Sequence, residues 1–169
     1  MKRYLALGAA VAIALSTTPA YAASDTNPYG TSTVDPAGPN EIIFTISKGK
    51  VASSFTTTRL NKMKSSTISI YEPFLKKRQS FTVIKLSTLF AMVHISGKDK
   101  VITKALNDYI FTATAADFVA ADGYLAIKRN GADIPYDQGG PIRIIFPDKS
   151  KWAKNLDAWN WSIATMTVK

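Results

Sequence analysis

Residues 139–152 read Gly-Gly-Pro-Ile-Arg-Ile-Ile-Phe-Pro-Asp-Lys-Ser-Lys-Trp. The β-branched and apolar run at 142–146 predicts a strand. Pro147 ends this strand because proline has no N–H for a further ladder bond, and the Gly-Gly-Pro in front of it marks a turn. The stretch 148–156 is polar, with Trp152 as its apolar anchor. A short strand between two turns is therefore the centre from which the fold is predicted.

The segments on either side of this strand are also β-like. A hairpin is predicted over residues 123–129, Asn130-Gly131 and residues 132–136, because Asn-Gly readily adopts the two positive φ angles of a type I′ turn. Residues 159–164 alternate, with Trp159, Trp161 and Ile163 on one face, which predicts a final strand over the core. Core packing is the simpler interpretation for at least one of these two tryptophans.

The upstream half adds further strands and short helices. Leucine and phenylalanine at helical spacing predict an amphipathic helix at 86–93, and Thr114 with Asp117 has capping-box spacing for a brief helix ending at 121. Strands are predicted at 41–46, 66–71, 81–84 and 107–113, with a loop at 72–80. The predicted fold class is α+β: a β-rich mixed fold with a few short helices.

The N-terminus has the pattern of a secretory signal peptide. Lys2 and Arg3 precede an apolar run at 5–15, and Ala20-Tyr21-Ala22 has the small-x-small form of a cleavage site. We expect cleavage after about Ala22, a flexible leader at 23–40 and one domain at 41–169, located in the periplasm or secreted. The chain has no cysteine, so thiolate chemistry is excluded.

The charge of the chain is positive and unevenly distributed. The net charge is +9, and residues 45–104 hold 12 Lys or Arg against Glu72 and Asp99. A basic face favours anionic partners such as a phosphorylated ligand, an acidic protein or membrane head groups. A solvated surface that keeps the protein soluble is the simpler interpretation. Nucleic acid is not an expected partner outside the cytoplasm.

Catalytic and metal motifs are sparse. His94 is the one histidine, and it has neither a cysteine nor a second imidazole to complete a zinc site, nor a Gly-x-Ser-x-Gly elbow to make it a catalytic base. Asp133 and Asp137 lie near each other, but the Tyr-Asp-Gln-Gly-Gly context is typical of a turn. No phosphate-binding glycine motif is present. We therefore expect no catalytic and no metal-ligating residues, and a ligand-binding domain.

The motifs around the starting strand resemble a known family. Asp122-Gly123-Tyr124, the Asn130-Gly131 turn, the Gly-Gly-Pro-Ile-Arg run and Ser150-Lys151-Trp152 resemble the molybdopterin-binding, sulfite-oxidase-like domain. Residues 81–90 are similar to that family's "f-x-G-V-x-L-x-x-L-L" segment. The resemblance spans about residues 41–168 and implies the sulfite-oxidase type of fold.

The resemblance also implies a function, with one departure. Catalytic members ligate molybdenum through a cysteine before that segment, where residues 68–78 of this chain offer Tyr71 and Glu72 instead. Similar small exported proteins without the cysteine bind a pterin without molybdenum, and some act as periplasmic sensors for membrane-bound signalling enzymes. A non-catalytic pterin-binding sensor is therefore expected. The alternatives are a molybdopterin-dependent oxidoreductase without a cysteine ligand and a basic adhesion or scaffold module.

The resemblance and the predicted loops give a set of ligand-binding residues. Arg143 and Lys151 match family positions near the cofactor, where Lys151 would meet a phosphate or a polar pterin edge. Trp152 is expected to pack rather than to contact the ligand. Loops that flank the expected cleft contribute the remaining candidates, which are Tyr71, Glu72, Arg78, Tyr109 and Asp117. A carboxylate among them suits the paired N–H donors of a pterin.

Overall fold

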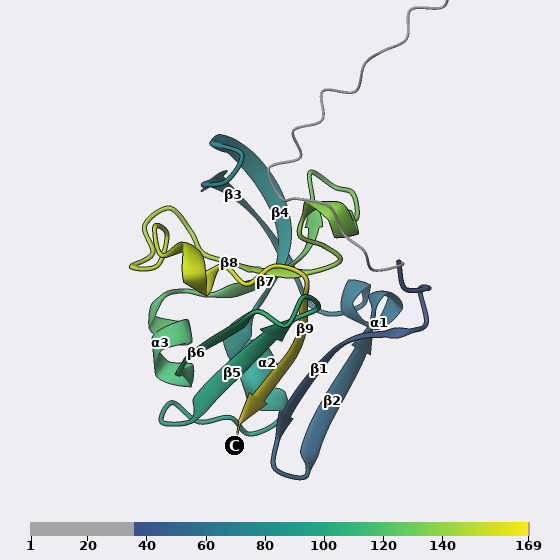
Figure 1. Ribbon diagram of the computed structural model, residues 1–169, viewed down its shortest axis with the longest axis vertical. Coiled ribbons are helices and arrows are strands. Elements are labelled where there is room, and N and C mark those ends of the chain that lie inside the picture. The colour runs from purple at the N-terminus through teal and green to yellow at the C-terminus, as the bar shows by residue number, and fades with distance from the viewer. Residues whose placement is uncertain (1–35, 169) are drawn as a thin grey trace, which may run out of the picture.

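The computed structural model describes residues 36–168, in which the strands form two sheets. The larger sheet has five strands in the order β2-β1-β9-β5-β6, and the neighbours pair antiparallel except for β1 and β9, which run parallel. Its strands are β1 (Ile42–Lys48), β2 (Val51–Thr56), β5 (Lys100–Ala105), β6 (Ile110–Thr114) and β9 (Ile163–Val168). The parallel pair brings the first and last strands of the described chain side by side at the middle of this sheet (Figure 1).

The smaller sheet is antiparallel throughout, in the order β3-β4-β7-β8. Its strands are β3 (Ser66–Glu72), β4 (Lys77–Lys85), β7 (Tyr124–Arg129) and β8 (Arg143–Ile145). The β3–β4 hairpin projects from the body of the molecule at the top of Figure 1. Backbone bonds from Ile144 N–H to the Asn160 carbonyl, 2.8 Å, and from Ile163 N–H to the Ile142 carbonyl, 3.2 Å, tie β8 to the approach to β9 and so join the two sheets.

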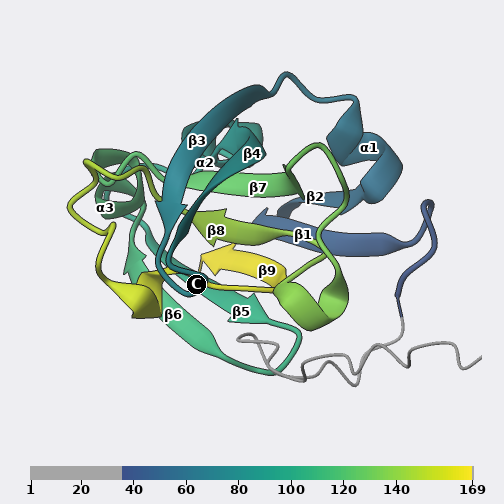
Figure 2. The ribbon, with the colours of Figure 1, turned by 90° about the horizontal axis from the view of Figure 1, so that it is seen from above.

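Short helices cover the sheets. They are α1 (Thr57–Asn61), α2 (Leu86–Met92) and α3 (Ala115–Ala120), with 3-10 turns η1 (Tyr136–Gln138) and η2 (Leu156–Ala158). The α2 helix lies behind the larger sheet and α3 lies beside β6, while the view from above shows α1 at the opposite end of the molecule from α3 (Figures 1 and 2). Both sheets and the helices contribute to one cluster of buried apolar side chains. No helix within residues 36–168 is long and apolar enough to span a membrane.

The α+β, β-rich fold class is confirmed, and several predicted elements are found. The 86–93 helix is α2, with Leu86, Leu89 and Phe90 buried. At α3 the Thr114 hydroxyl accepts the Asp117 backbone N–H at 3.1 Å, as the capping-box spacing predicted. Asn130 and Gly131 have φ values of 52° and 81°, as a type I′ turn requires.

Other elements differ from the prediction. The 72–80 loop is wrong, because Lys77 already pairs with Glu72 and the basic residues form the start of β4. The second arm of the 123–136 hairpin is also wrong: after a single bridge between Arg129 and Ala132, the chain turns into η1. The final strand begins only at Ile163.

The signal peptide and most of the leader lie outside the described residues. Strands β2 and β5 and helix α1 were not predicted. β5 alternates between buried Val101, Thr103 and Ala105 and the less buried Lys100, Ile102 and Lys104, and an isoleucine on the outer face and a threonine on the inner face give a weak hydrophobic pattern. The predicted alternation at 159–164 puts Asn160 on the face opposite Trp159 and Trp161, but Asn160 is fully buried, and its amide donates to the Thr103 hydroxyl at 2.9 Å.

Candidate functional site

A buried ion pair lies where β3 ends and β8 begins. Arg143 Nη2 is 3.1 Å from Glu72 Oε1, and both side chains are fully buried. The second carboxylate oxygen, Oε2, accepts the Leu75 backbone N–H at 2.6 Å. The Arg143 guanidinium also lies over the Phe81 ring, 4.9 Å from its centroid. Both oxygens of Glu72 therefore have partners inside the protein.

Aromatic side chains cover this ion pair. The Phe74 ring, in the turn between β3 and β4, meets the Trp161 ring edge-on, with centroids 3.9 Å apart. The Trp161 ring centroid in turn lies 5.7 Å from the Arg143 guanidinium carbon. Arg143 and Glu72 were predicted to bind ligand, and in this conformation they can reach one only if the aromatic cover moves. Their ligand-binding role stays a prediction.

Tyr71 and Arg78 contact Asp148, which lies in the loop after β8, the strand at the opposite edge of the smaller sheet from β3. The Tyr71 backbone N–H donates to Asp148 Oδ1 at 2.7 Å, and Arg78 forms an ion pair with Oδ2 of the same carboxylate. The Tyr71 hydrogen bond, followed by the Arg78 guanidinium, lowers the pKa of Asp148 below its usual value. The Tyr71 side chain itself is 51% exposed. Asp148, which was not predicted as a site residue, thus occupies the open edge of β3.

Lys151 and Asp117 are also brought together. Lys151 Nζ is 2.9 Å from Asp117 Oδ1, and both side chains are about half exposed. A hydrogen bond from the Thr114 hydroxyl and then the Lys151 ammonium lower the pKa of Asp117. Trp152 lies under Lys151 and packs edge-on against the rings of Phe111, Phe118 and Phe146, which agrees with its expected packing role.

Tyr109 is hydrogen-bonded to the η2 turn. Its hydroxyl donates to the Asp157 carbonyl at 3.0 Å, and partial burial followed by the Asp157 charge raises the pKa of the Tyr109 phenol. The seven predicted ligand-binding residues therefore fall into separate groups, and each group is held by contacts within the protein. Whether any of them binds a ligand stays a prediction.

A pocket of about 730 Å³ lies elsewhere, between α1, the first described residues, and the segment around η1. This volume is within the roughly 300–1,000 Å³ of typical small-molecule sites. The walls are mainly proline, isoleucine and leucine side chains, with a few polar groups. The lining residues are Pro36, Ala37, Pro39, Ile43, Thr57, Leu60, Asn61, Ile127, Asp133, Ile134, Pro135, Tyr136, Asp137, Pro141 and Ile142.

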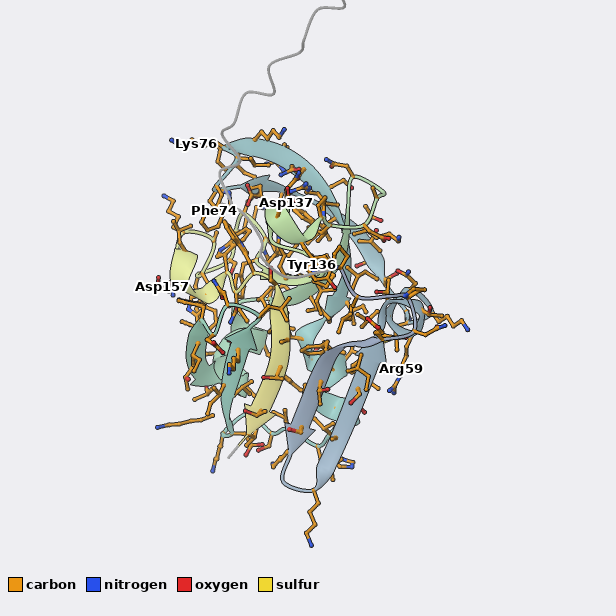
Figure 3. All side chains as sticks on the ribbon, turned by 45° about the vertical axis from the view of Figure 1, so that its right-hand side comes forward. Arg59, Phe74, Lys76, Tyr136, Asp137 and Asp157 are labelled. Carbon is orange, nitrogen blue, oxygen red and sulfur yellow. The ribbon has the colours of Figure 1, made fainter. Side chains whose placement is uncertain are left out.

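Two features hold the η1 side of this pocket in place. The Tyr136 hydroxyl accepts the Ala37 backbone N–H at 2.9 Å and so ties η1 to the start of the described chain. Gly140 lies directly against the Ile134 carbonyl, where an added Cβ would be only 1.9 Å from the oxygen. Tyr136 and Asp137 lie next to each other in Figure 3, away from Asp157.

None of the predicted ligand-binding residues lines this pocket. The Tyr-Asp-Gln-Gly-Gly stretch was interpreted as a turn, and η1 is a turn, but its residues also form a pocket wall. Asp133 and Asp137, which were noted as neighbours in the sequence, both line the pocket. The closeness of these two aspartates in the sequence was the one signal from which this pocket could have been predicted. Nothing in the sequence indicated that α1 forms the other wall.

The residues present do not fit a molybdenum ion anchored by the protein. The full sequence has no thiol, and at the strand end that the resemblance points to, both oxygens of Glu72 are bound within the protein. Residues 36–168 contain no group of three or more His, Asp or Glu side chains that could hold a metal. His94 is exposed, just after α2.

Comparisons with known proteins agree with the fold. The family described as "Oxidoreductase molybdopterin binding domain" matches residues 50–163, and the chain belongs to this family. Among solved structures, the sulfane dehydrogenase SoxCD from Paracoccus pantotrophus superposes with a TM-score of 0.61 at 12% identity. The match covers 79% of this chain and 39% of that chain. The search of curated protein sequences found no match.

Proposed function

We propose that this protein binds a pterin without a protein-ligated molybdenum, as a non-catalytic periplasmic sensor that reports to a membrane-bound signalling protein. The observation that carries the proposal is the buried Glu72–Arg143 pair. It fills the strand end at which, by the resemblance, catalytic members of the family place their cysteine.

Charge and burial explain why this pair argues against a metal centre. To ligate a metal, Glu72 would have to leave Arg143, and a buried guanidinium without its partner costs about 3–5 kcal/mol. Carboxylate is also a harder ligand than the thiolate it would replace. The chain retains the fold but has no cysteine to anchor the metal. This favours binding of a pterin over an oxo-transfer reaction.

The family and the surface support the other parts of the proposal. A molybdopterin-binding domain implies a pterin-type ligand, and the structure has a pocket of suitable size. The N-terminal signal-peptide pattern supports export. Lys76 and Lys77, exposed at the projecting β3–β4 hairpin, offer a basic surface for an acidic partner domain.

The experiment is to purify the full chain from the periplasm, denature it, and identify the released small molecules by fluorescence and mass spectrometry. Molybdenum is measured in the same sample, and the ligand-free protein is titrated with oxidised and reduced neopterin. A bound pterin or micromolar affinity, with molybdenum far below one atom per chain, is the expected result. Stoichiometric molybdenum, or no affinity for either form, would overturn the proposal.

A further inference from the structure

We propose that the outer edge of β3 is a docking site for an extended acidic segment of a protein partner, which adds to the smaller sheet as a fifth strand. In the free protein the Asp148–Arg78 ion pair occupies part of this edge, and the partner strand replaces it. This inference deepens the proposed function, on which it rests for the existence of a protein partner, and its test uses no pterin.

β3 lies at one edge of the smaller sheet. It pairs with β4, and no other strand within residues 36–168 pairs with it. The backbone groups of successive residues in an antiparallel strand point alternately toward and away from a neighbouring strand. Because the Tyr71 N–H reaches Asp148, away from β4, the backbone groups of Ser69 and Thr67 point outward as well. Thr67 and Ser69 are also exposed, so this edge is open to another strand.

Two side chains bond to this edge in the way that a neighbouring strand would. Asp148 Oδ1 accepts the Tyr71 N–H at 2.7 Å, as a strand carbonyl would. Arg78 Nη1 donates to the Ser69 carbonyl at 3.2 Å, as a strand amide would. The same two side chains form an ion pair with each other. Together they therefore take the place of one peptide unit of an added strand.

A partner strand can displace this ion pair at little cost. The side chains of Arg78 and Asp148 are 59% and 36% exposed, and exposed ion pairs contribute little to stability because water and salt screen them. An acidic strand brings a carbonyl for the Tyr71 N–H and a carboxylate for the Arg78 guanidinium. It therefore replaces each broken contact with one of the same kind and adds further backbone hydrogen bonds.

The charge around this edge selects an acidic strand. Lys76 and Lys77 are exposed at the projecting β3–β4 hairpin, and Lys149 is exposed next to Asp148 (Figure 3). Residues 66–80 hold one acidic residue, Glu72, whose carboxylate is buried. The lysines thus outnumber the exposed carboxylates at this edge, and a surplus of one charge attracts partners of the other.

An exposed aromatic ring and the charge of the chain both favour a different protein as the partner. Tyr71 is 51% exposed on β3, and tyrosine and arginine are enriched among the residues that carry the binding energy of protein interfaces. A second copy of this chain would bring the same lysines and a net charge of +9 to the edge. Because like charges repel, an acidic partner is favoured over self-association.

The test measures, by fluorescence anisotropy, how the full-length protein binds a labelled peptide of about ten residues that alternates glutamate with valine, a pattern that suits a strand. One matched peptide has lysine in place of every glutamate. Another has proline in place of the central valines, which keeps the charge but removes N–H groups that a strand needs. We expect the acidic peptide to bind at least tenfold more tightly than either matched peptide.

The first variant removes the carboxylate from the edge. Asp148→Ala leaves the Tyr71 N–H and the Arg78 guanidinium free for the peptide, so binding should become at least threefold tighter. The matched control is Asp108→Asn, which removes the same charge from an exposed ion pair with Lys104 in the larger sheet. Asparagine tolerates the positive φ of 65° at this position. Binding to the control should be unchanged.

Two further variants test the edge itself. Ser69→Pro removes an outward N–H while the ladder to β4 keeps its bonds, because edge strands tolerate proline where the N–H faces solvent. We expect at least tenfold weaker binding, with the circular dichroism spectrum unchanged. Arg78→Ala removes the cation that meets the carboxylate of the peptide and leaves the backbone of β3 as it is. It should weaken binding about fivefold, which keeps the test decisive if Ser69→Pro fails to fold.

The outcomes separate this inference from the proposed function. If the proline-containing peptide binds as tightly as the acidic peptide, charge alone attracts it and strand addition is overturned. If neither wild-type protein nor Asp148→Ala binds the acidic peptide, the docking site is overturned, whereas a pterin released from the purified protein would still support the proposed ligand. If Asp148→Ala forms dimers without peptide, as measured by light scattering, the occupant is a second copy and the acidic partner is overturned.

Discussion

Two polar regions of this molecule differ in the space that surrounds their charged residues. In the paired-charge region, which comprises Glu72 with Arg143, Arg78 with Asp148, and Asp117 with Lys151, each carboxylate faces a cation of the same chain. In the acidic pocket between α1 and η1, Asp133 is also paired, with Lys128 at 2.7 Å, but Asp133 and Asp137 belong to the lining of an open cavity with apolar walls. The contrast teaches that basic residues at cofactor-like positions can serve the fold, while an open pocket carries the capacity to bind.

The largest predicted effect comes from the centre of the paired-charge region. Arg143→Met should lower the free energy of unfolding by about 3–5 kcal/mol, because it leaves the Glu72 carboxylate buried without its cation. Urea unfolding followed by tryptophan fluorescence measures this loss. The result would show that Arg143 stabilises the smaller sheet by pairing with Glu72 at the end of β3.

The control for this prediction is the double variant Glu72→Leu with Arg143→Met. Replacing both charges by apolar side chains removes the uncompensated carboxylate, so the double variant should recover most of the lost stability. If Arg143→Met alone unfolds at the wild-type urea concentration, the pair does not stabilise the fold and the comparison is broken.

A smaller loss is expected at the wall of the acidic pocket. A Cβ at Gly140 would lie 1.9 Å from the Ile134 carbonyl oxygen, so Gly140→Ala must shift the wall. We expect a loss of about 1–3 kcal/mol, as for other overpacked sites, together with weaker neopterin binding. Gly97→Ala is the matched control, since its Cβ would meet only Ala116 at an ordinary 3.5 Å. Equal stability of the two variants would contradict the close approach.

The acidic pocket shows why sequence reasoning reached the fold more fully than the site. Local signals such as the Asn130-Gly131 turn, the Thr114 cap and the α2 periodicity depend on neighbouring residues, and the structure confirms them. The pocket combines α1, β1, β7 and η1, which are far apart in the chain. α1 has five residues and one buried apolar side chain, so it has no periodicity from which to predict it.

The sequence predicted only part of the paired-charge region, because this region too is formed by residues far apart in the chain. The resemblance pointed to Arg143 and Lys151, and loop position pointed to Glu72 and Asp117. Which cation faces which carboxylate is decided by long-range packing, and Asp148, the partner of Arg78, was not selected. The sequence could name charged residues but could not show that they satisfy each other.

Low pH should weaken the paired-charge region. The pKa of Asp148 lies below its ordinary value of about 3.9, because the Tyr71 N–H and then Arg78 stabilise the carboxylate. A lowered pKa adds stability above the ordinary value, and that stability is lost as pH falls through the folded-state pKa. The urea midpoint should therefore drop from pH 6 to pH 3, and less so in Asp148→Asn than in Asp157→Asn. An equal drop in both variants would contradict this.

The smallest predicted effect is that of the exposed pair. Lys151→Ala should change the free energy of unfolding by less than about 1 kcal/mol, since exposed ion pairs contribute little and are screened by salt. It should also leave neopterin affinity unchanged, whereas a phosphate or pterin contact at Lys151 would make binding weaker. Titration of this variant thus separates the acidic pocket from the position that the family resemblance points to.

Hydrogen–deuterium exchange of the full-length protein with and without neopterin tests the central claim most directly, because it reports on both regions in one experiment. The account predicts that neopterin slows exchange at residues 57–61 and 133–137 and leaves residues 71–78 and 148–151 unchanged. Protection confined to residues 71–78 and 148–151 would contradict it and would place the ligand among the paired charges.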